Sequence, residues 1–246
     1  MGIKYKDDPH LEFLMFCEND DLSILVDFLT KSKIDKLRLT ERLTSEKRFK
    51  ECNEEFSEIW DLIAGELQLF GADSIVSLIR GGKGVLYRKI LIDVCKQLKV
   101  DINSKSEVGK IETKLLMKIV EDSFEKMNEE EKREFAKNFN INVANLSTVA
   151  FMAALQTAIH AGGFATYKLA VIVANAAARN ILGRGLSLAG NAVLVRGISI
   201  LAGPIGWAIS VILTLPMITG PAYRVTIPSV IQIAYMRQKY INKEII

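Results

Sequence analysis

The first candidate for chemistry is a glycine-rich loop with two cations, Arg80-Gly81-Gly82-Lys83-Gly84. A phosphate-binding P-loop requires a preceding strand, the spacing GxxxxGK and a following Ser or Thr that holds magnesium. Here Val85 follows the loop, and the residues before it have the pattern of a helix. Glycines that can adopt a positive φ also suit a turn between two helices. The sequence therefore favours a turn over a nucleotide site.

Other side chains that could act as acid, base, nucleophile or metal ligand do not converge. The two histidines, His10 and His160, are far apart, and the sequence has no HExxH, GxSxG or zinc-deaminase motif. The acidic clusters Glu54-Glu55 and Glu129-Glu130-Glu131 stand where helices are expected to begin or to face water. We therefore predict a non-enzymatic protein with no catalytic, cofactor-binding or metal-binding residue.

The three cysteines, Cys17, Cys52 and Cys95, are widely spaced and form no CxxC pair. Their odd number and spacing predict neither a disulfide framework nor a zinc site. They are expected to be buried thiols in a reducing compartment. The first nine residues are polar, so no secretory signal is expected. The predicted location is a cytoplasm, either free or at the inner face of a membrane.

Charge is distributed unevenly along the chain. Residues 1–145 carry 24 basic and 28 acidic side chains, a net charge of −4, whereas residues 146–246 carry eight basic side chains and one acidic, a net charge of +7. Such an asymmetry indicates that the second half meets an anionic or apolar partner. Nucleic acid is disfavoured, because the cations are spaced singly and no aromatic residues lie between them to stack on bases. The remaining candidate partners of the second half are membrane lipid and another protein.

The first half has the periodicity of amphipathic helices and almost no strand alternation. Apolar residues recur at spacings of three and four in four stretches, which are expected to close around a shared core. The stretches begin after Asn19-Asp20, which are expected to cap the first helix, after Asn53-Glu54-Glu55, near Val85 and near Leu115. A polar run follows from Asn128 to Lys137.

The second half is long, apolar and poor in charge. Its most apolar stretch, residues 198–219, has 22 residues, which is enough for a helix to cross the roughly 30 Å hydrocarbon core of a membrane. Pro204, Pro216 and Pro221 interrupt this region, which favours a kinked or re-entrant hairpin over a straight span. Residues 146–196 fit two close-packed helices, an interfacial layer or a soluble core. His160 is expected to be a satisfied core histidine rather than a proton or headgroup site.

Small residues recur through the second half at spacings that allow helix backbones to approach closely. The closing block, residues 223–237, is expected to be an extended stretch that enters an amphipathic helix. The candidates for membrane contact or close packing are Gly197, Gly203, Gly206, Trp207, Pro216, Tyr223 and Arg224.

Several blocks resemble the YaaW-like family of uncharacterised bacterial proteins. The N-terminal block is Asp8-Pro9-His10-Leu11-Glu12-Phe13-Leu14, the central block is Phe70-Gly71-Ala72-Asp73-Ser74-Ile75 with the glycine-rich loop, and the C-terminal block is Gly220-Pro221-Ala222-Tyr223-Arg224-Val225-Thr226-Ile227-Pro228. The resemblance makes the loop a family feature. It therefore adds a candidate contact loop formed by Arg80, Gly81, Gly82, Lys83, Gly84 and Arg88.

The resemblance carries no catalytic residues to this chain. The central part of the family is grouped with ubiquinol–cytochrome c chaperones, which are helical assembly factors without catalysis. The resemblance therefore implies a helical, non-enzymatic protein of the bacterial cytoplasm, or one associated with the inner membrane.

Together these observations predict an all-α protein with an N-terminal helical domain and a Gly/Ala-rich, hydrophobic, hairpin-like C-terminal region. The predicted divisions are a short helical module at residues 1–50, a central helical domain at 51–145 and a hydrophobic basic region at 146–246. We expect the last region to insert in or pack on a membrane, and an oligomeric membrane-perturbing module is one form of this hypothesis. The alternative is a soluble, chaperone-like assembly factor whose apolar region is buried in its own core or in an oligomer interface. A homo-oligomer is compatible with both.

Overall fold

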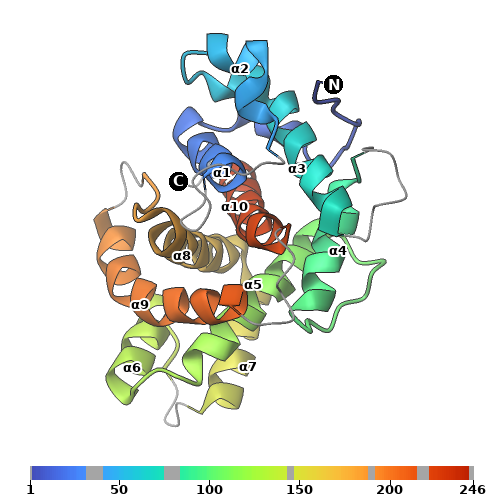
Figure 1. Cartoon of the computed structure of the whole chain (residues 1–246). Helices are drawn as coiled ribbons and strands as arrows, with labels where there is room; N and C mark the ends of the chain where they lie inside the picture. The colour runs from blue at the N-terminus through green and yellow to red at the C-terminus, as the bar shows by residue number, and fades with distance from the viewer. Residues whose placement is uncertain are drawn as a thin grey trace.

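The fold is entirely helical over the residues that the structure describes. The computed structural model describes residues 2–31, 41–74, 84–142, 147–187, 192–214 and 222–243, and all their side chains except those of residues 73, 74, 163 and 192–202. Every regular element in these ranges is a helix (Figure 1). The predicted all-α class is confirmed.

The elements follow one another as α-helices with three short 3-10 helices near the N-terminus. In chain order they are η1 (Glu12–Phe16), α1 (Asn19–Thr30), η2 (Leu43–Ser45), α2 (Lys47–Glu51), η3 (Phe56–Ile59), α3 (Trp60–Ser74), α4 (Tyr87–Gln97), α5 (Val108–Phe124), α6 (Glu129–Asn138), α7 (Thr148–Ala161), α8 (Gly163–Leu182), α9 (Ala192–Thr214) and α10 (Tyr223–Ile241).

The helices predicted in the first half are present, and their apolar stripes form part of the core. The polar run after Asn128 is α6, where the Asn128 side chain and the Glu131 side chain form a reciprocal capping box. Asn19 and Asp20 lie inside the first turn of α1 rather than capping it, and the N-cap position is Glu18. The prediction of the capping residue was therefore wrong by one or two positions.

The central helix of the molecule is α10, although residues 223–237 were expected to begin as an extended stretch. It is helical from Tyr223, contains Pro228 within the helix and is buried without interruption from Val225 to Met236. It packs on α8, α1, α5, α3 and α4, which surround it in Figure 1. A helix enclosed on every side needs no polar face. A pattern of apolar residues on one side only therefore does not predict such a helix.

The second central helix is α8, which comes from the Ala-rich part of the second half. Nearly all of its side chains from Leu169 to Ala178 are buried. Small alanine side chains let the neighbouring backbones approach, and α9 and α10 both pack against α8. Within residues 146–196, the described helices α7 and α8 pack against each other, as in the first of the three arrangements left open.

A buried ion pair joins α10 to α5. The Arg237 guanidinium donates to both carboxylate oxygens of Glu112, at 2.9 and 3.2 Å. The Tyr87 hydroxyl of α4 donates to the same carboxylate at 2.6 Å, and burial raises the pKa of this tyrosine. A second guanidinium nitrogen donates to the backbone oxygen of His10 at 2.7 Å, while the guanidinium lies over the Phe13 ring. One side chain thus binds four elements of the chain together.

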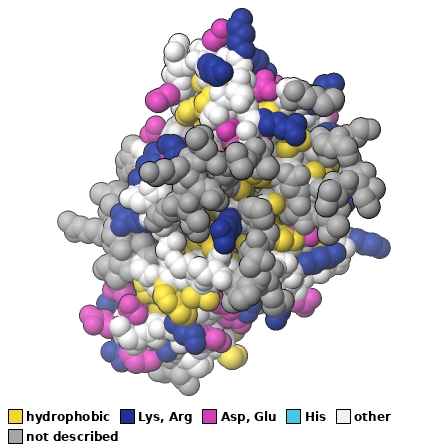
Figure 2. All heavy atoms as spheres, viewed as in Figure 1, with side chains coloured by type: hydrophobic (Ala, Val, Ile, Leu, Met, Phe, Trp, Pro, Cys, Tyr) yellow, Lys and Arg dark blue, Asp and Glu magenta, His cyan; other side chains and the backbone are white. Residues whose placement is uncertain are grey.

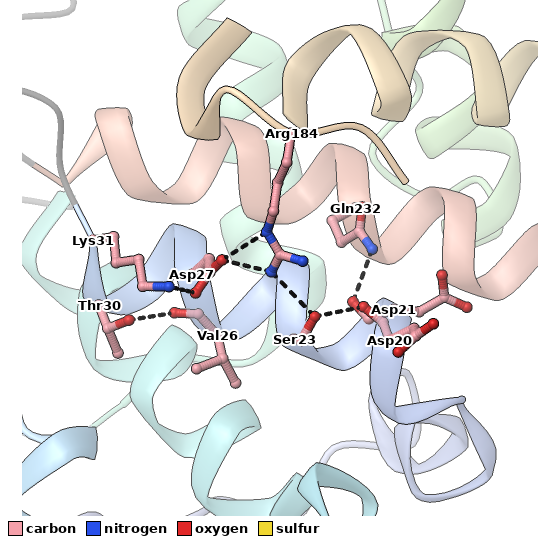
Figure 3. A network of polar contacts seen from close by, with 9 residues as sticks. All are labelled: Asp20, Asp21, Ser23, Val26, Asp27, Thr30, Lys31, Arg184 and Gln232. Carbon is pink, nitrogen blue, oxygen red and sulfur yellow. Dashed lines mark hydrogen bonds and ion pairs between the residues drawn. The ribbon is translucent and has the colours of Figure 1, made fainter. Parts of the chain in front are cut away.

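Further polar contacts tie α1 to the C-terminal half. The Gln232 side chain donates to the backbone oxygen of Asp21, and the Tyr235 hydroxyl donates to the Asp21 carboxylate. Arg184, just after α8, donates to Asp27 at 2.6 Å and to the Ser23 hydroxyl (Figure 3). Figure 3 shows α1 linked in this way to both α10 and the segment after α8.

The predicted division at residues 50 and 145 stays a prediction. The contacts of α10 nevertheless bring all three stretches into one core, because α10 packs on α1 of the first stretch, on α3 to α5 of the second and on α8 of the third. The N-terminal stretch is therefore integrated into the fold rather than attached to its surface.

Arg237→Met is expected to destabilise the protein by about 3 to 5 kcal/mol, because it leaves the Glu112 carboxylate buried without its cation. Adding Glu112→Leu is expected to recover part of this loss, since no buried charge then remains. Guanidinium unfolding followed by circular dichroism measures both effects. Lys47→Met is the control, because Lys47 and its partner Glu51 are largely exposed. A loss for Arg237→Met no larger than that of the control would show that the pair does not support the fold.

Candidate interaction groove

The predicted contact loop is described only at its C-terminal end. Arg80, Gly81, Gly82 and Lys83 lie outside the described residues. Gly84 packs directly on α3, where a Cβ atom would lie 2.8 Å from the Cβ of Gln68. This position therefore needs glycine for a close approach of two backbones. Arg88 points to the loop before α5, where it donates to the backbone oxygens of Ser104 and Ser106.

The predicted packing residues of the second half have different surroundings. Gly206 is buried on α8, with the site of its missing Cβ 3.8 Å from the backbone oxygen of Ala176. Gly203 has open space beside it, and Trp207 is 50% exposed. Gly197 lies in the part of α9 whose side chains are not described, and Pro216 lies outside the described residues.

Tyr223 and Arg224 begin α10. The Tyr223 hydroxyl donates to Asp93 of α4 at 2.9 Å, and burial with this contact raises its pKa to about 12. The Nε atom of Arg224 is buried without a hydrogen-bond partner. Both residues therefore lie against protein at the start of the central helix. None of these observations tests a membrane role for the predicted residues.

The expectation of a membrane-crossing segment at residues 198–219 gains no support. Among the described residues, no helix combines the length and the apolar character that a crossing requires. In the second half of α9, Ile205, Ile209 and Ile212 are buried, and α9 lies on α8, α5 and α6. On the face shown in Figure 2, the described apolar side chains are seen in small groups between charged side chains and residues that the structure does not describe.

Two adjoining hollows form a groove between α5 and α7. One has a volume of about 510 Å³ and the other about 490 Å³. Both are lined by Lys114, Met117 and Gln156, so they meet along α5. The loop at residues 100–107 closes one side, and Arg88 holds this loop through the two serine carbonyls. We call this feature the α5–α7 groove.

The groove has an apolar floor of side chains that are half-buried. On α5 the lining residues recur at spacings of three and four, from Lys110 to Glu121, so one face of the helix borders the groove. One face of α7 borders the opposite side. The floor consists of Val100, Ile102, Met117, Met152 and Ile159. Methionine is flexible and polarisable, and it suits surfaces that adapt to apolar partners of different shape.

The rim of the groove carries lysines that are held by neighbouring oxygens. Lys118 forms ion pairs with Glu121 at 3.0 Å and Asp122 at 2.8 Å, and the hydrogen bond to Asp122 raises its pKa. Lys114 donates to the backbone oxygen of Asp101 at 3.0 Å, and Lys110 pairs with Glu107 at 3.2 Å. The rim is thus polar and nearly balanced in charge around an apolar floor, which is the general layout of a protein-binding surface.

The surroundings of His160 differ from those that the sequence predicted. His160 was expected in the core, but it is exposed on α7 and lines the groove. Its place at the last turn of an edge helix explains the difference.

Cys52 and Cys95 are buried and Cys17 is half-buried, and none of the three is in a disulfide. Burial raises the pKa of Cys17 and Cys95 to about 12, so both thiols are protonated at neutral pH.

The chain resembles a set of bacterial proteins over nearly its whole length. A Helicobacter pylori protein named "UPF0174 protein" is 48% identical, over 96% of this chain and 93% of the relative. The Escherichia coli "UPF0174 protein YaaW" is 35% identical over 97% of each chain. The chain belongs to the UPF0174 family.

Two family models match separate parts of this member of the family. The model described as "Ubiquinol-cytochrome C chaperone" matches residues 43–231, and a domain of unknown function, DUF3944, matches residues 5–39. A second H. pylori "UPF0174 protein" is 37% identical over 82% of this chain and 98% of the relative. No solved structure matches the chain. The resemblance to the YaaW-like family is confirmed.

Arg88→Ala is expected to loosen the loop that closes the groove, because it removes both bonds to the serine carbonyls. The backbone amide of Ser106, which donates to Asn103, should then exchange its hydrogen several-fold faster. Hydrogen exchange followed by mass spectrometry measures this. Lys89→Ala, a change of the exposed neighbour on α4, should leave the rate as it is. Equal rates in the wild type and in Arg88→Ala would contradict the positioning role.

Proposed function

We propose that this protein is a non-enzymatic, chaperone-like assembly factor that binds an amphipathic helical segment of another protein in the α5–α7 groove. The observation that carries the proposal is the groove itself, with its apolar floor, polar rim and combined length along two helices. An amphipathic helix binds by laying its apolar face into such a groove. One face of α5 and one face of α7 would then contact the apolar face of the bound helix.

The family match supports a protein partner. The chaperone model covers residues 43–231, and this range includes α5, α7 and the loop that Arg88 holds. A groove assembled from this part of the chain is therefore compatible with the role that the model's description names.

The placement of the buried charges supports a binding role over catalysis. Glu112 is bound by Arg237 and Tyr87, and Asp21 is bound by Lys239 and Tyr235. Catalytic acids and bases need access to a substrate, whereas these carboxylates stabilise contacts between helices. Burial also keeps the Cys17 and Cys95 thiols protonated. These groups therefore serve the fold that presents the groove.

A photo-crosslinking amino acid placed at Gln156 tests the proposal in bacterial cells. Gln156 is exposed on α7 and lines both hollows of the groove. Illumination is expected to give a discrete adduct with one or a few proteins, identified by mass spectrometry. The same amino acid at Val149, which is 82% exposed on α7 and lines neither hollow, is the matched control.

Met117→Glu places a charge on the groove floor and is expected to remove the Gln156 adduct, because a buried charge opposes an apolar face. Since Met117 is half-buried, circular dichroism must show that the variant keeps its helical content. Adducts of equal intensity from Gln156 and Val149, or an adduct that persists in folded Met117→Glu, would refute binding in the groove.

Flotation of the purified protein with phosphatidylglycerol vesicles separates this proposal from the membrane hypothesis. The assembly-factor proposal predicts that the protein stays in the dense fraction, because α9 and α10 both pack against α8, and their buried apolar residues then face protein. Flotation that is lost in Trp207→Ser, a change of the half-exposed α9 tryptophan, would instead support insertion or packing of the second half on lipid.

A further inference from the structure

Exposed apolar side chains gather where η1 meets the end of α10. Within the described residues, eight large apolar side chains are exposed, and four of them belong to two short stretches, Met15-Phe16 and Tyr240-Ile241. The rings of Phe16 and Tyr240 stack with centroids 5.8 Å apart, so the two stretches lie side by side. We call these four residues the terminal patch. Grouped apolar side chains on a surface mark sites of interaction more often than scattered ones do.

A pocket opens beside Phe16 and Tyr240 of the terminal patch. Its volume is about 270 Å³, and its apolar lining comes from Phe16, Cys17, Met236 and Tyr240. This size lies slightly below the range of about 300 to 1,000 Å³ usual for sites that enclose whole small molecules. It suits one large side chain of a partner. Aromatic walls around such a pocket are typical of the anchor positions that dominate protein-binding energy.

The charged groups at and next to the pocket leave one negative charge in excess. Glu18 and Asp21 both line the pocket, and Lys239 lies between them at 2.8 Å from each carboxylate. Lys243, which also lines it, balances these charges. Asp20, exposed in the same turn of α1, adds a third carboxylate, so the net charge of the five groups is −1. Glu18 keeps 65% of its side chain exposed, so it can accept a second cation from outside.

The patch depends on both ends of the chain. Met15, Phe16 and Glu18 lie in the range matched by the DUF3944 model, whereas Tyr240 and Ile241 lie beyond the end of the chaperone model at residue 231. The tie between Lys239 and the two carboxylates holds the ends together. The patch shares no lining residue with the α5–α7 groove.

We propose that the terminal patch binds a basic amphipathic segment of a partner protein, which inserts one large apolar side chain into the pocket and places flanking Lys or Arg residues beside Glu18 and Asp20. The apolar pocket supplies the anchor, and the acidic side selects the charge of the flanks. This site is separate from the proposed groove, so a failure of binding at one site does not argue against binding at the other.

Selection of displayed random dodecapeptides on the purified full-length protein tests the proposal. The enriched peptides are expected to carry an aromatic or large aliphatic residue flanked by Lys or Arg. A fluorescein-labelled copy of the most enriched peptide then gives the dissociation constant by fluorescence anisotropy. Tyr240→Ser is expected to weaken binding about tenfold or more, because it removes a wall of the pocket.

Two further variants separate the apolar and the charged parts of the site. Glu18→Gln is expected to weaken binding several-fold and to reduce its dependence on salt, because one charge pair is lost. Trp207→Ser, at an aromatic residue of similar exposure on α9, is the matched control and should bind as the wild type does. Met117→Glu should also bind normally, since it alters only the groove. Circular dichroism checks that each variant is folded.

Three results would overturn the proposal. The first is an absence of enriched peptides, or enrichment of acidic ones. The second is binding that Tyr240→Ser leaves unchanged. The third is another occupant: sedimentation that shows self-association abolished by Tyr240→Ser would assign the patch to a second copy of the chain, and vesicle flotation abolished by the same change would assign it to lipid.

Discussion

The buried Arg237 side chain is the point on which the arrangement of the fold depends. Its guanidinium satisfies the Glu112 carboxylate, the backbone oxygen of His10 and the face of the Phe13 ring, and these groups belong to α5, the N-terminal segment and η1. A buried charge is costly unless its partners are complete. The observed arrangement of α10 and the N-terminal segment completes these contacts, and the other polar contacts of α1 reinforce it.

The same packing leaves two different surfaces on one chain. On α5, Leu115, Leu116 and Ile119 are buried in the core, while Met117 stays half-buried on the face that borders the groove. The rings of Phe16 and Tyr240 stack, although the two residues are separated by most of the chain. Most of the groove's lining comes from residues 100–160, whereas the terminal patch combines residues 15–16 with residues 240–241.

The sequence predicted the helices whose apolar residues lie on one face. Their spacing identified α1, α3, α4 and α5, and the acidic cluster Glu129-Glu130-Glu131 was expected where a helix begins or faces water. The spacing failed for residues 223–237, which were expected to begin as an extended stretch, whereas α10 is helical from Tyr223 and includes Thr226, Pro228, Ser229 and Gln232. All four are buried in the helix. Gln232 finds its partner in Asp21, and local periodicity carries no information about such distant contacts.

The binding surfaces were harder to predict than the fold class. Met117 and Met152 line the groove, but each is one methionine beside a more regular apolar stripe, so neither stood out. Gly84 and Gly206, both singled out in the sequence, lie where backbones approach closely. Close packing of this kind does not by itself form a binding site. Arg88, predicted as part of a contact loop, donates to Ser104 and Ser106 of the same chain, and a contact with a partner stays a prediction.

Native-state hydrogen exchange in low concentrations of guanidinium tests most directly whether the N-terminal segment and α10 form one cooperative unit. The amides of α1 from Leu22 to Phe28 and those of α10 from Val225 to Met236 are then expected to open with the same free energy and the same dependence on denaturant. Opening of α1 at a lower free energy, while α10 stays protected, would contradict this account and show that the N-terminal segment is a separate module.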